Sequence, residues 1–107
     1  MDFVSAYALT VAIEAVALFL VLKKEYGVAL IARNAVIASS LTLPFVWFVF
    51  GGLALPWMAA IALGEAFAVL VEAGFYKLAF RGMVLERALL TSIACNLASF
   101  IIGLLLP

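Results

Sequence analysis

Residues 3–22 read FVSAYALTVAIEAVALFLVL, an apolar segment in which Glu14 is the one charged side chain. A helix of about 20 residues matches the thickness of a hydrocarbon core of roughly 30 Å. The segment ends at Lys23-Lys24-Glu25-Tyr26-Gly27, where charges arrive together with a glycine that stops a helix. We therefore expect the first membrane-spanning helix over residues 3–22.

Three further apolar segments have similar lengths. They cover about residues 28–50, 57–78 and 86–106, and the third begins just after Pro56, a residue suited to the first turn of a helix. The sequence thus predicts an all-α polytopic bundle of four transmembrane helices that forms a single domain over residues 1–107.

The composition of the chain supports a membrane location. Of the 107 residues, 70% are hydrophobic and 11% are charged, and the mean hydropathy is +1.37. A water-soluble domain of this size has too little interior to hide so much apolar surface. A signal peptide would open with basic residues, whereas Asp2 is the only early charge, so we expect the first helix to be retained.

The basic residues predict the orientation of the helices. All six flank the first or the third turn, and the middle turn, residues 51–56, carries none. Basic residues concentrate in cytoplasmic loops. We therefore expect both charged turns in the cytoplasm and both termini outside.

The two halves of the chain resemble each other. The stretch Val11–Ala15 matches Val69–Ala73, and Ser39–Thr42 matches Asn96–Ser99 after a slip of one residue. Each half then has a Glu, a basic turn and a polar step on the returning helix. The pattern predicts two parallel-repeat helical hairpins related by an axis along the membrane normal.

Carboxylates inside the apolar segments are the most informative feature. Glu14, Glu65 and Glu72 all lie there, although a charge near the bilayer centre costs about 2.5 to 3.5 kcal/mol. Glu65 and Glu72 share a helical face because they are two turns apart. Depending on whether the third helix ends at Lys77 or Arg81, either acid lies near the midplane, and the sequence leaves both open.

Small and polar residues recur at helical spacing, so we expect the polar face of each helix to point to one axis. Two interpretations follow: the polar groups fix the register of the bundle, or they form a polar path or cation site. An all-oxygen set suits protons or hard cations such as Na⁺, Ca²⁺, Mg²⁺ or Mn²⁺, with the metal, if any, left open. The candidate ion- or proton-binding residues are Glu14, Glu65, Glu72, Asn96, Ser39, Thr42 and Ser99.

These residues favour proton- or cation-coupled permeation or exchange, with Glu14 and Glu72 as carriers or ligands and Asn96 as their neutral partner. The alternative is a non-catalytic structural subunit or scaffold of a larger membrane complex. We expect no enzyme and no cofactor, because there is no histidine and Cys95 is the only cysteine. The expected partners are the lipid bilayer, further copies of the chain in a homo-oligomer and a proton or hard cation, but no nucleic acid.

The length, the four spans and Glu14 superficially resemble the small multidrug resistance transporters, which bind protons and cationic drugs at their first helix. That resemblance covers little beyond the first helix and Lys23. The third helix lacks the Gly, Tyr, Ala, Trp and Gly pattern that shapes the drug pocket of that family, and it carries Glu65 and Glu72 instead.

Most of the chain resembles uncharacterised small prokaryotic four-span membrane proteins. The similar stretches are Thr42-Leu43-Pro44 with Val46-Trp47, Val71-Glu72-Ala73, and Arg87-Ala88 leading to Ser92, Asn96, Ser99 and Gly103. The resemblance implies the four-span topology, the repeat and a location in the prokaryotic cell membrane. It implies no activity.

Overall fold

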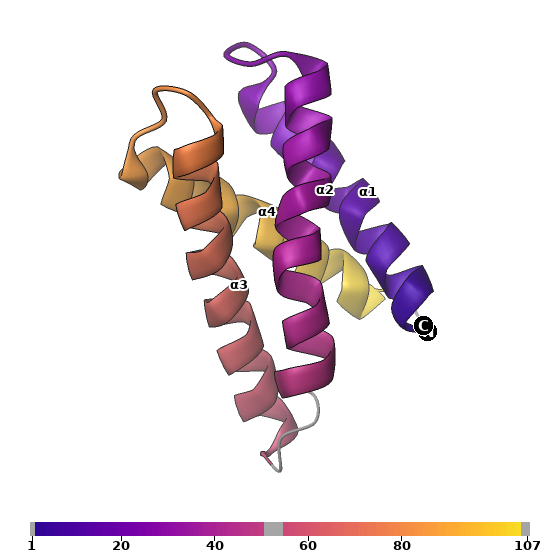
Figure 1. Cartoon of the computed structure of the whole chain (residues 1–107). Helices are drawn as coiled ribbons and strands as arrows, with labels where there is room; N and C mark the ends of the chain where they lie inside the picture. Colours follow the sequence, from indigo (N-terminus) through magenta and orange to yellow (C-terminus); the bar gives the residue numbers. More distant parts are fainter. Residues whose placement is uncertain (1, 51–54, 106–107) are drawn as a thin grey trace.

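The computed structural model describes residues 2–50 and 55–105, and its only regular secondary structure in those ranges is helical. Residues 51–54 of the expected middle turn and residue 106 of the fourth expected segment lie outside this description. The elements are α1 (Phe3–Leu22), α2 (Val28–Pro44), the π-helical η1 (Phe45–Phe50), α3 (Trp57–Ala79) and α4 (Leu85–Leu105) (Figure 1).

Local signals explain where the helices begin and turn. The side chain of Asp2 caps α1 by accepting a hydrogen bond of 2.7 Å from the backbone N–H of Ser5. Gly27 precedes α2 with an extended backbone. Gly82 has φ +82, a left-handed conformation that favours glycine, and it turns the chain between α3 and α4.

The second apolar segment changes its helical pitch at Pro44. Proline has no N–H to donate to the preceding turn, and its ring crowds the carbonyl four residues back. The α-helix ends there, and the chain continues as the wider π-helix η1 rather than breaking. Residues 28–50 are thus helical throughout, with two different hydrogen-bonding patterns.

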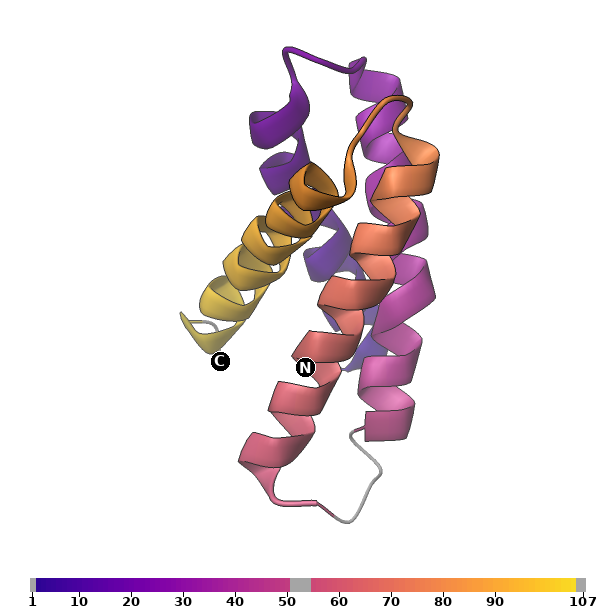
Figure 2. The same cartoon turned by 90° about the vertical axis from the view of Figure 1, so that its left-hand side faces the viewer.

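The helices form two hairpins that point the same way. α1 packs on α2 and α3 packs on α4, while the α1–α4 and α2–α3 contacts join the two hairpins. The turn between α1 and α2 and the turn between α3 and α4 lie at one end of the molecule, and the start of α1 and the end of α4 lie away from these turns (Figures 1 and 2). The fold is the expected all-α arrangement of two parallel hairpins.

Burial follows the internal repeat. The buried residues of α1 have buried counterparts on α3: Ala6 and Gly64, Glu14 and Glu72, Leu18 and Tyr76, Leu22 and Phe80. The same holds for five buried residues of α2 and their counterparts on α4: Ile31 and Ala88, Asn34 and Thr91, Ala35 and Ser92, Ala38 and Cys95, Ser39 and Asn96. The sixth, Thr42, corresponds to Ser99, which is half-buried. Equivalent residues therefore face the interior in both hairpins, as a pseudo-two-fold arrangement requires.

The surface and the interior have the polarity that a lipid environment favours. Glu72 is 1% exposed and Asn34 is fully buried, whereas Leu78 is 86% and Val4 is 74% exposed. All four helices are long and apolar enough to cross a membrane. The longest dimension of the molecule is 41 Å, close to the 40 to 45 Å of a bilayer with its headgroups. These features are consistent with an integral membrane protein.

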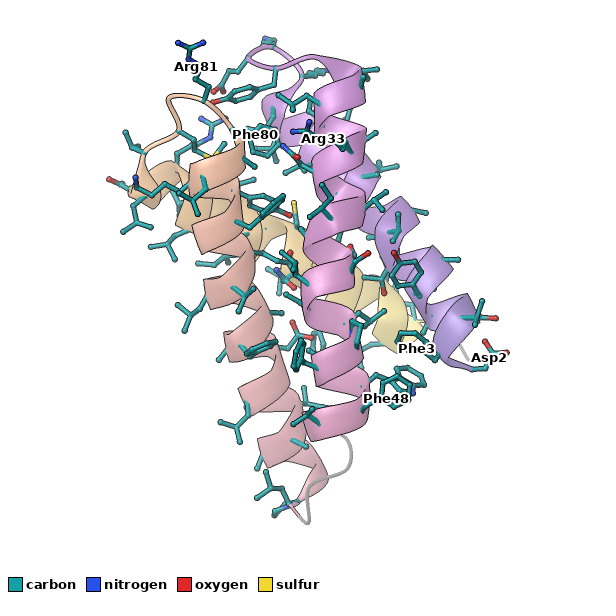
Figure 3. The ribbon with its side chains drawn as sticks, viewed as in Figure 1. Asp2, Phe3, Arg33, Phe48, Phe80 and Arg81 are labelled. Atoms are coloured by element: carbon teal, nitrogen blue, oxygen red, sulfur yellow. The ribbon has the colours of Figure 1, made fainter. Side chains whose placement is uncertain are left out.

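The interior is apolar near the turns and polar farther along. Leu18, Leu22, Ile31, Tyr76 and Phe80 belong to one buried apolar cluster. Phe80 lies near the turn that carries Arg81, whereas Phe3 and Phe48 lie towards the opposite side (Figure 3). The apolar cluster closes the bundle at the turn end, and the acidic residues lie beyond it.

Candidate functional site

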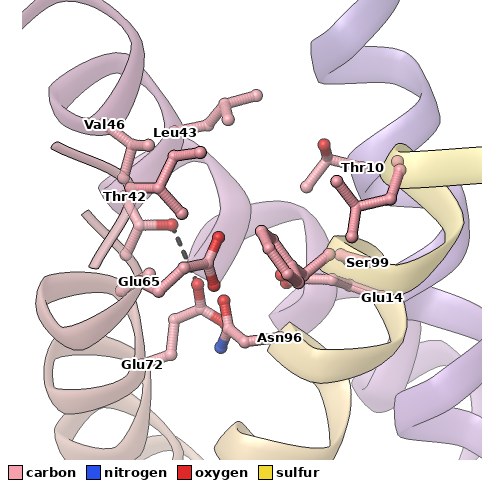
Figure 4. Close-up of a pocket in the computed structure, with 14 residues that line it drawn as sticks. Thr10, Glu14, Thr42, Leu43, Val46, Glu65, Glu72, Asn96 and Ser99 are labelled. Atoms are coloured by element: carbon pink, nitrogen blue, oxygen red, sulfur yellow. Dashed lines mark hydrogen bonds between the residues drawn. The ribbon is translucent and has the colours of Figure 1, made fainter. Parts of the chain in front are cut away.

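A pocket of about 320 Å³ lies in the part of the bundle beyond the apolar cluster, and residues of all four α-helices and of η1 line it (Figure 4). Its polar lining residues are Thr10, Glu14, Thr42, Glu65, Glu72, Asn96 and Ser99. Its apolar lining residues are Leu43, Val46, Ile61, Ala68, Phe100, Gly103 and Leu104. The pocket thus brings together groups from every part of the chain.

Glu72 is the most connected acid in this pocket. It accepts hydrogen bonds from the Thr42 hydroxyl at 2.9 Å and from the Asn96 amide at 3.2 Å. A longer contact of 3.4 Å joins it to the hydroxyl of Tyr76, one turn along α3. The carboxyl group of Glu72 therefore links α3 to both α2 and α4.

Glu14 is held by its own hairpin. Its carboxyl group accepts a hydrogen bond of 3.1 Å from the hydroxyl of Ser39 on α2, and only 2% of the residue is exposed. The carboxyl groups of Glu14 and Glu72 also lie close enough to interact with each other. The two acids form a directly interacting pair between the hairpins.

Glu65 lies two turns before Glu72 on α3 and is only half-buried. Its carboxyl group makes no hydrogen bond or ion pair within residues 2–50 and 55–105, although its charge acts on Glu14. In Figure 4 the carboxyl groups of Glu65 and Glu72 and the amide of Asn96 point into the same space. Of the two acids on α3, Glu72 is therefore the partner of Glu14.

The two halves of the site match, except at one hydroxyl. Ser39 and Asn96 are equivalent in the repeat, and each donates to the Glu of its own hairpin. Thr42 also donates across the hairpins to Glu72. Its counterpart is Ser99, whose buried hydroxyl oxygen has no hydrogen-bond partner in the part of the chain that the structure describes.

No basic side chain balances these acids. The residues lining the pocket include no lysine or arginine. Over the described ranges, the single ion pair joins Arg87 to Glu25 at 2.6 Å, at the end where the turns lie. The acids of the pocket therefore have only hydroxyl and amide donors around them.

The structure brings all seven candidate residues into one site. Glu14, Glu65, Glu72, Thr42, Asn96 and Ser99 line the pocket, and Ser39 reaches it through its hydrogen bond to Glu14. Among the described residues, no three Asp, Glu, His or Cys side chains are grouped closely enough to hold a metal ion. The geometry offers a carboxyl pair with neutral donors rather than a multi-carboxylate metal centre.

Three polar residues of the interior were missed by the sequence analysis. Tyr76 contacts Glu72, and its spacing of one helical turn from that acid was a signal for it. Asn34 and Thr91 are equivalent in the repeat, and each buries a polar atom that has no partner over the described ranges. The signal for Asn34 and Thr91 is their equivalence in the repeat, which becomes visible when the alignment of the two halves is extended beyond the acids.

Comparison of the chain with protein-family models, with curated proteins and with solved structures finds no match.

Proposed function

We propose that this chain is an integral membrane protein that supports proton- or cation-coupled permeation or exchange, with Glu14 and Glu72 as the groups that carry the ion. The single observation behind the proposal is that two directly interacting, buried acids have no basic residue near them. Two carboxylates repel each other strongly in a low-dielectric interior. Such a pair favours a proton or a cation between its members.

The surroundings of the pair suit repeated uptake and release. Thr42, Ser39 and Asn96 donate to the acids, and neutral donors stabilise a carboxylate without a permanent counter-charge. A proton needs only the pair, whereas a hard cation needs further oxygens, which the hydroxyl groups and water can supply. The groups in the pocket therefore suit a proton better than a hard cation.

The proposed setting is the prokaryotic cell membrane, with both termini outside and the basic turns in the cytoplasm. The arrangement of two parallel hairpins supports this, because it gathers all six basic residues at the end of the bundle that carries the two turns. We further propose a homo-oligomer, since four helices enclose little space and a second copy would seal the polar pocket. A single monodisperse monomer, both in mild detergent and in lipid, would contradict the oligomer.

The alternative function is a structural subunit or scaffold of a larger membrane complex. One observation favours it: the hydrogen bonds of Glu14 and Glu72 connect α1 to α2 and connect α3 to both α2 and α4. Buried polar contacts of this kind fix helix register in membranes. In that case the acids serve assembly and carry nothing.

Ion flux into proteoliposomes separates the two functions. Protons and a panel of mono- and divalent cations are followed for the native chain and for the Glu14→Gln/Glu72→Gln variant, which keeps shape but removes titration. Glu86→Gln, at the first turn of α4 near the basic end, is the matched control. Flux that is lost in the double variant and kept in Glu86→Gln supports transport. No flux of any ion, from a native protein that is folded in the vesicles, supports the scaffold.

A further inference from the structure

One side of the pocket holds polar groups that the chain itself leaves unused. Thr42 donates to Glu72, but its repeat counterpart Ser99 has a buried oxygen without a partner over the described ranges. Glu65 faces the same pocket and receives no hydrogen bond from those residues either. Burying the Ser99 hydroxyl group without a partner is costly. The unused polar groups of Ser99 and Glu65, in the pocket that Glu14 also lines, therefore indicate a binding site for a ligand.

The chemistry of these groups restricts what the ligand can be. Ionised carboxyl groups only accept hydrogen bonds, and a serine hydroxyl can accept as well as donate. With no basic residue lining the pocket, the complementary group is a cation that carries several N–H donors. A primary ammonium group has three such donors, pointing in different directions.

The size and the walls of the pocket add a second restriction. Its volume of about 320 Å³ lies in the range typical of small-molecule sites, about 300 to 1,000 Å³, and is far larger than the roughly 30 Å³ of a water molecule. Leu43, Val46 and Phe100 supply apolar walls beside the acids. A bare metal ion would leave most of this space unused, whereas an organic cation with a hydrocarbon part would fill it.

We propose that the pocket binds an amphiphilic primary amine, with its ammonium group held by Glu65, Glu14 and the Ser99 hydroxyl and its hydrocarbon part against Leu43, Val46 and Phe100. The inference rests on the proposed function, because it names the cation that would exchange with protons at the Glu14–Glu72 pair. The unpartnered hydroxyl group of Ser99 is the observation that places the ammonium group on this side of the pocket.

Calorimetric titration of the full chain in mild detergent tests the proposal, with hexylamine as the probe. At pH 7 this amine is protonated, as a lysine side chain is. Hexyltrimethylammonium has the same tail and charge but no N–H donor, and hexanol has the tail without the charge. We expect hexylamine to bind roughly tenfold more tightly than hexyltrimethylammonium, because charge-assisted hydrogen bonds are lost, and hexanol to bind more weakly still. Equal binding of the two cations would overturn the proposal without any variant.

Substitutions then identify the side chains that bind the ammonium group. Glu65→Gln is expected to weaken hexylamine binding roughly tenfold and Ser99→Ala about threefold. The matched controls are Glu86→Gln and Ser5→Ala, which remove a carboxyl and a hydroxyl group outside the pocket. All variants must elute as the native chain does in size-exclusion chromatography. Binding that falls equally in the controls, or does not fall in Glu65→Gln, would overturn the assignment.

Two further experiments distinguish a free amine from a lipid headgroup and test amine binding separately from the proposed transport. Chain reconstituted in phosphatidylcholine with or without phosphatidylethanolamine shows whether the amine is free or a lipid headgroup, because a headgroup occupant would compete with hexylamine. Proton flux that depends on Glu14 and Glu72 without hexylamine binding would overturn this inference alone. Hexylamine binding without any flux would overturn the proposed transport and leave the binding site standing.

Discussion

Glu14 and Glu72 occupy equivalent positions in the two hairpins, and each accepts a hydrogen bond from the returning helix of its own hairpin, 3.1 Å from Ser39 and 3.2 Å from Asn96. The correspondence extends to the buried residues around them. A repeated hairpin thus builds a nearly two-fold site out of a chain of 107 residues. Because the acids meet between the hairpins, neither half contains the whole site.

Replacing Glu72 with methionine should lower the free energy of unfolding only modestly. Its two principal donors keep other acceptors, since Thr42 also bonds to the carbonyl of Ala38 at 3.1 Å and Asn96 to the carbonyl of Ser92 at 2.9 Å. Hydrogen bonds between membrane helices contribute about 1 kcal/mol each. We expect a loss below about 2 kcal/mol, measured by reversible denaturation in detergent. A loss of about 4 kcal/mol would mean that the acid is chiefly structural.

Gly82→Ala should destabilise the turn between α3 and α4. The backbone of Gly82 has φ +82, and a side chain in this left-handed region costs about 1 to 2 kcal/mol. Gly27→Ala is the control, because Gly27 has φ −70 and open space around an added Cβ atom. The same denaturation experiment should show a loss for Gly82→Ala and almost none for Gly27→Ala, and equal effects would contradict the account of the turn.

The Arg87–Glu25 ion pair should contribute little to stability. Its side chains are 40% and 46% exposed, and exposed ion pairs contribute between about 0 and 1 kcal/mol. Glu25→Gln should therefore change the melting temperature slightly, and less at high salt, where charges are screened. A large fall in melting temperature that salt does not alter would contradict this account, because an exposed ion pair is weak and screened by salt.

Acid should loosen the start of α1. The backbone N–H of Ser5 bonds to Asp2 and holds the pKa of that carboxyl below its ordinary value of 3.8. A depressed pKa stabilises the folded form above the ordinary value, and this contribution is lost as the pH falls below about 3.8 towards the lower folded value. Hydrogen exchange at the Ser5 amide should show more opening in that range. Asp2→Asn should remove the pH dependence, because asparagine caps without titrating.

The sequence was sufficient for the helices and for the seven candidate residues that the structure brings together, but not for every polar residue of the interior. Apolar segments of membrane-spanning length, interrupted at Lys23–Gly27 and near Gly82, leave few alternatives to a helical bundle. Polar side chains spaced along one face, such as Ser92 and Asn96, avoid lipid by turning inward. The structure buries both of these residues.

The remaining features depend on packing, which a single sequence does not specify. After Pro44 the chain continues as the π-helix η1, which contacts both α2 and α3, whereas a proline in the sequence is equally compatible with a kink. The choice between Glu65 and Glu72 required the position of α3 along its axis relative to α2 and α4, because the two acids share one helical face. The unpartnered hydroxyl of Ser99 appears only when the two halves of the folded site are compared.

The central claim is that Glu14 and Glu72 act as one ion-carrying site, and the proton flux of the two single variants tests it most directly. Glu14→Gln and Glu72→Gln are reconstituted separately and compared with the native chain and with Glu86→Gln after a pH jump across the vesicle membrane. Groups that act as a unit have non-additive effects, so we predict that each single variant loses flux as completely as the double variant does. Near-native flux in either single variant would contradict the claim.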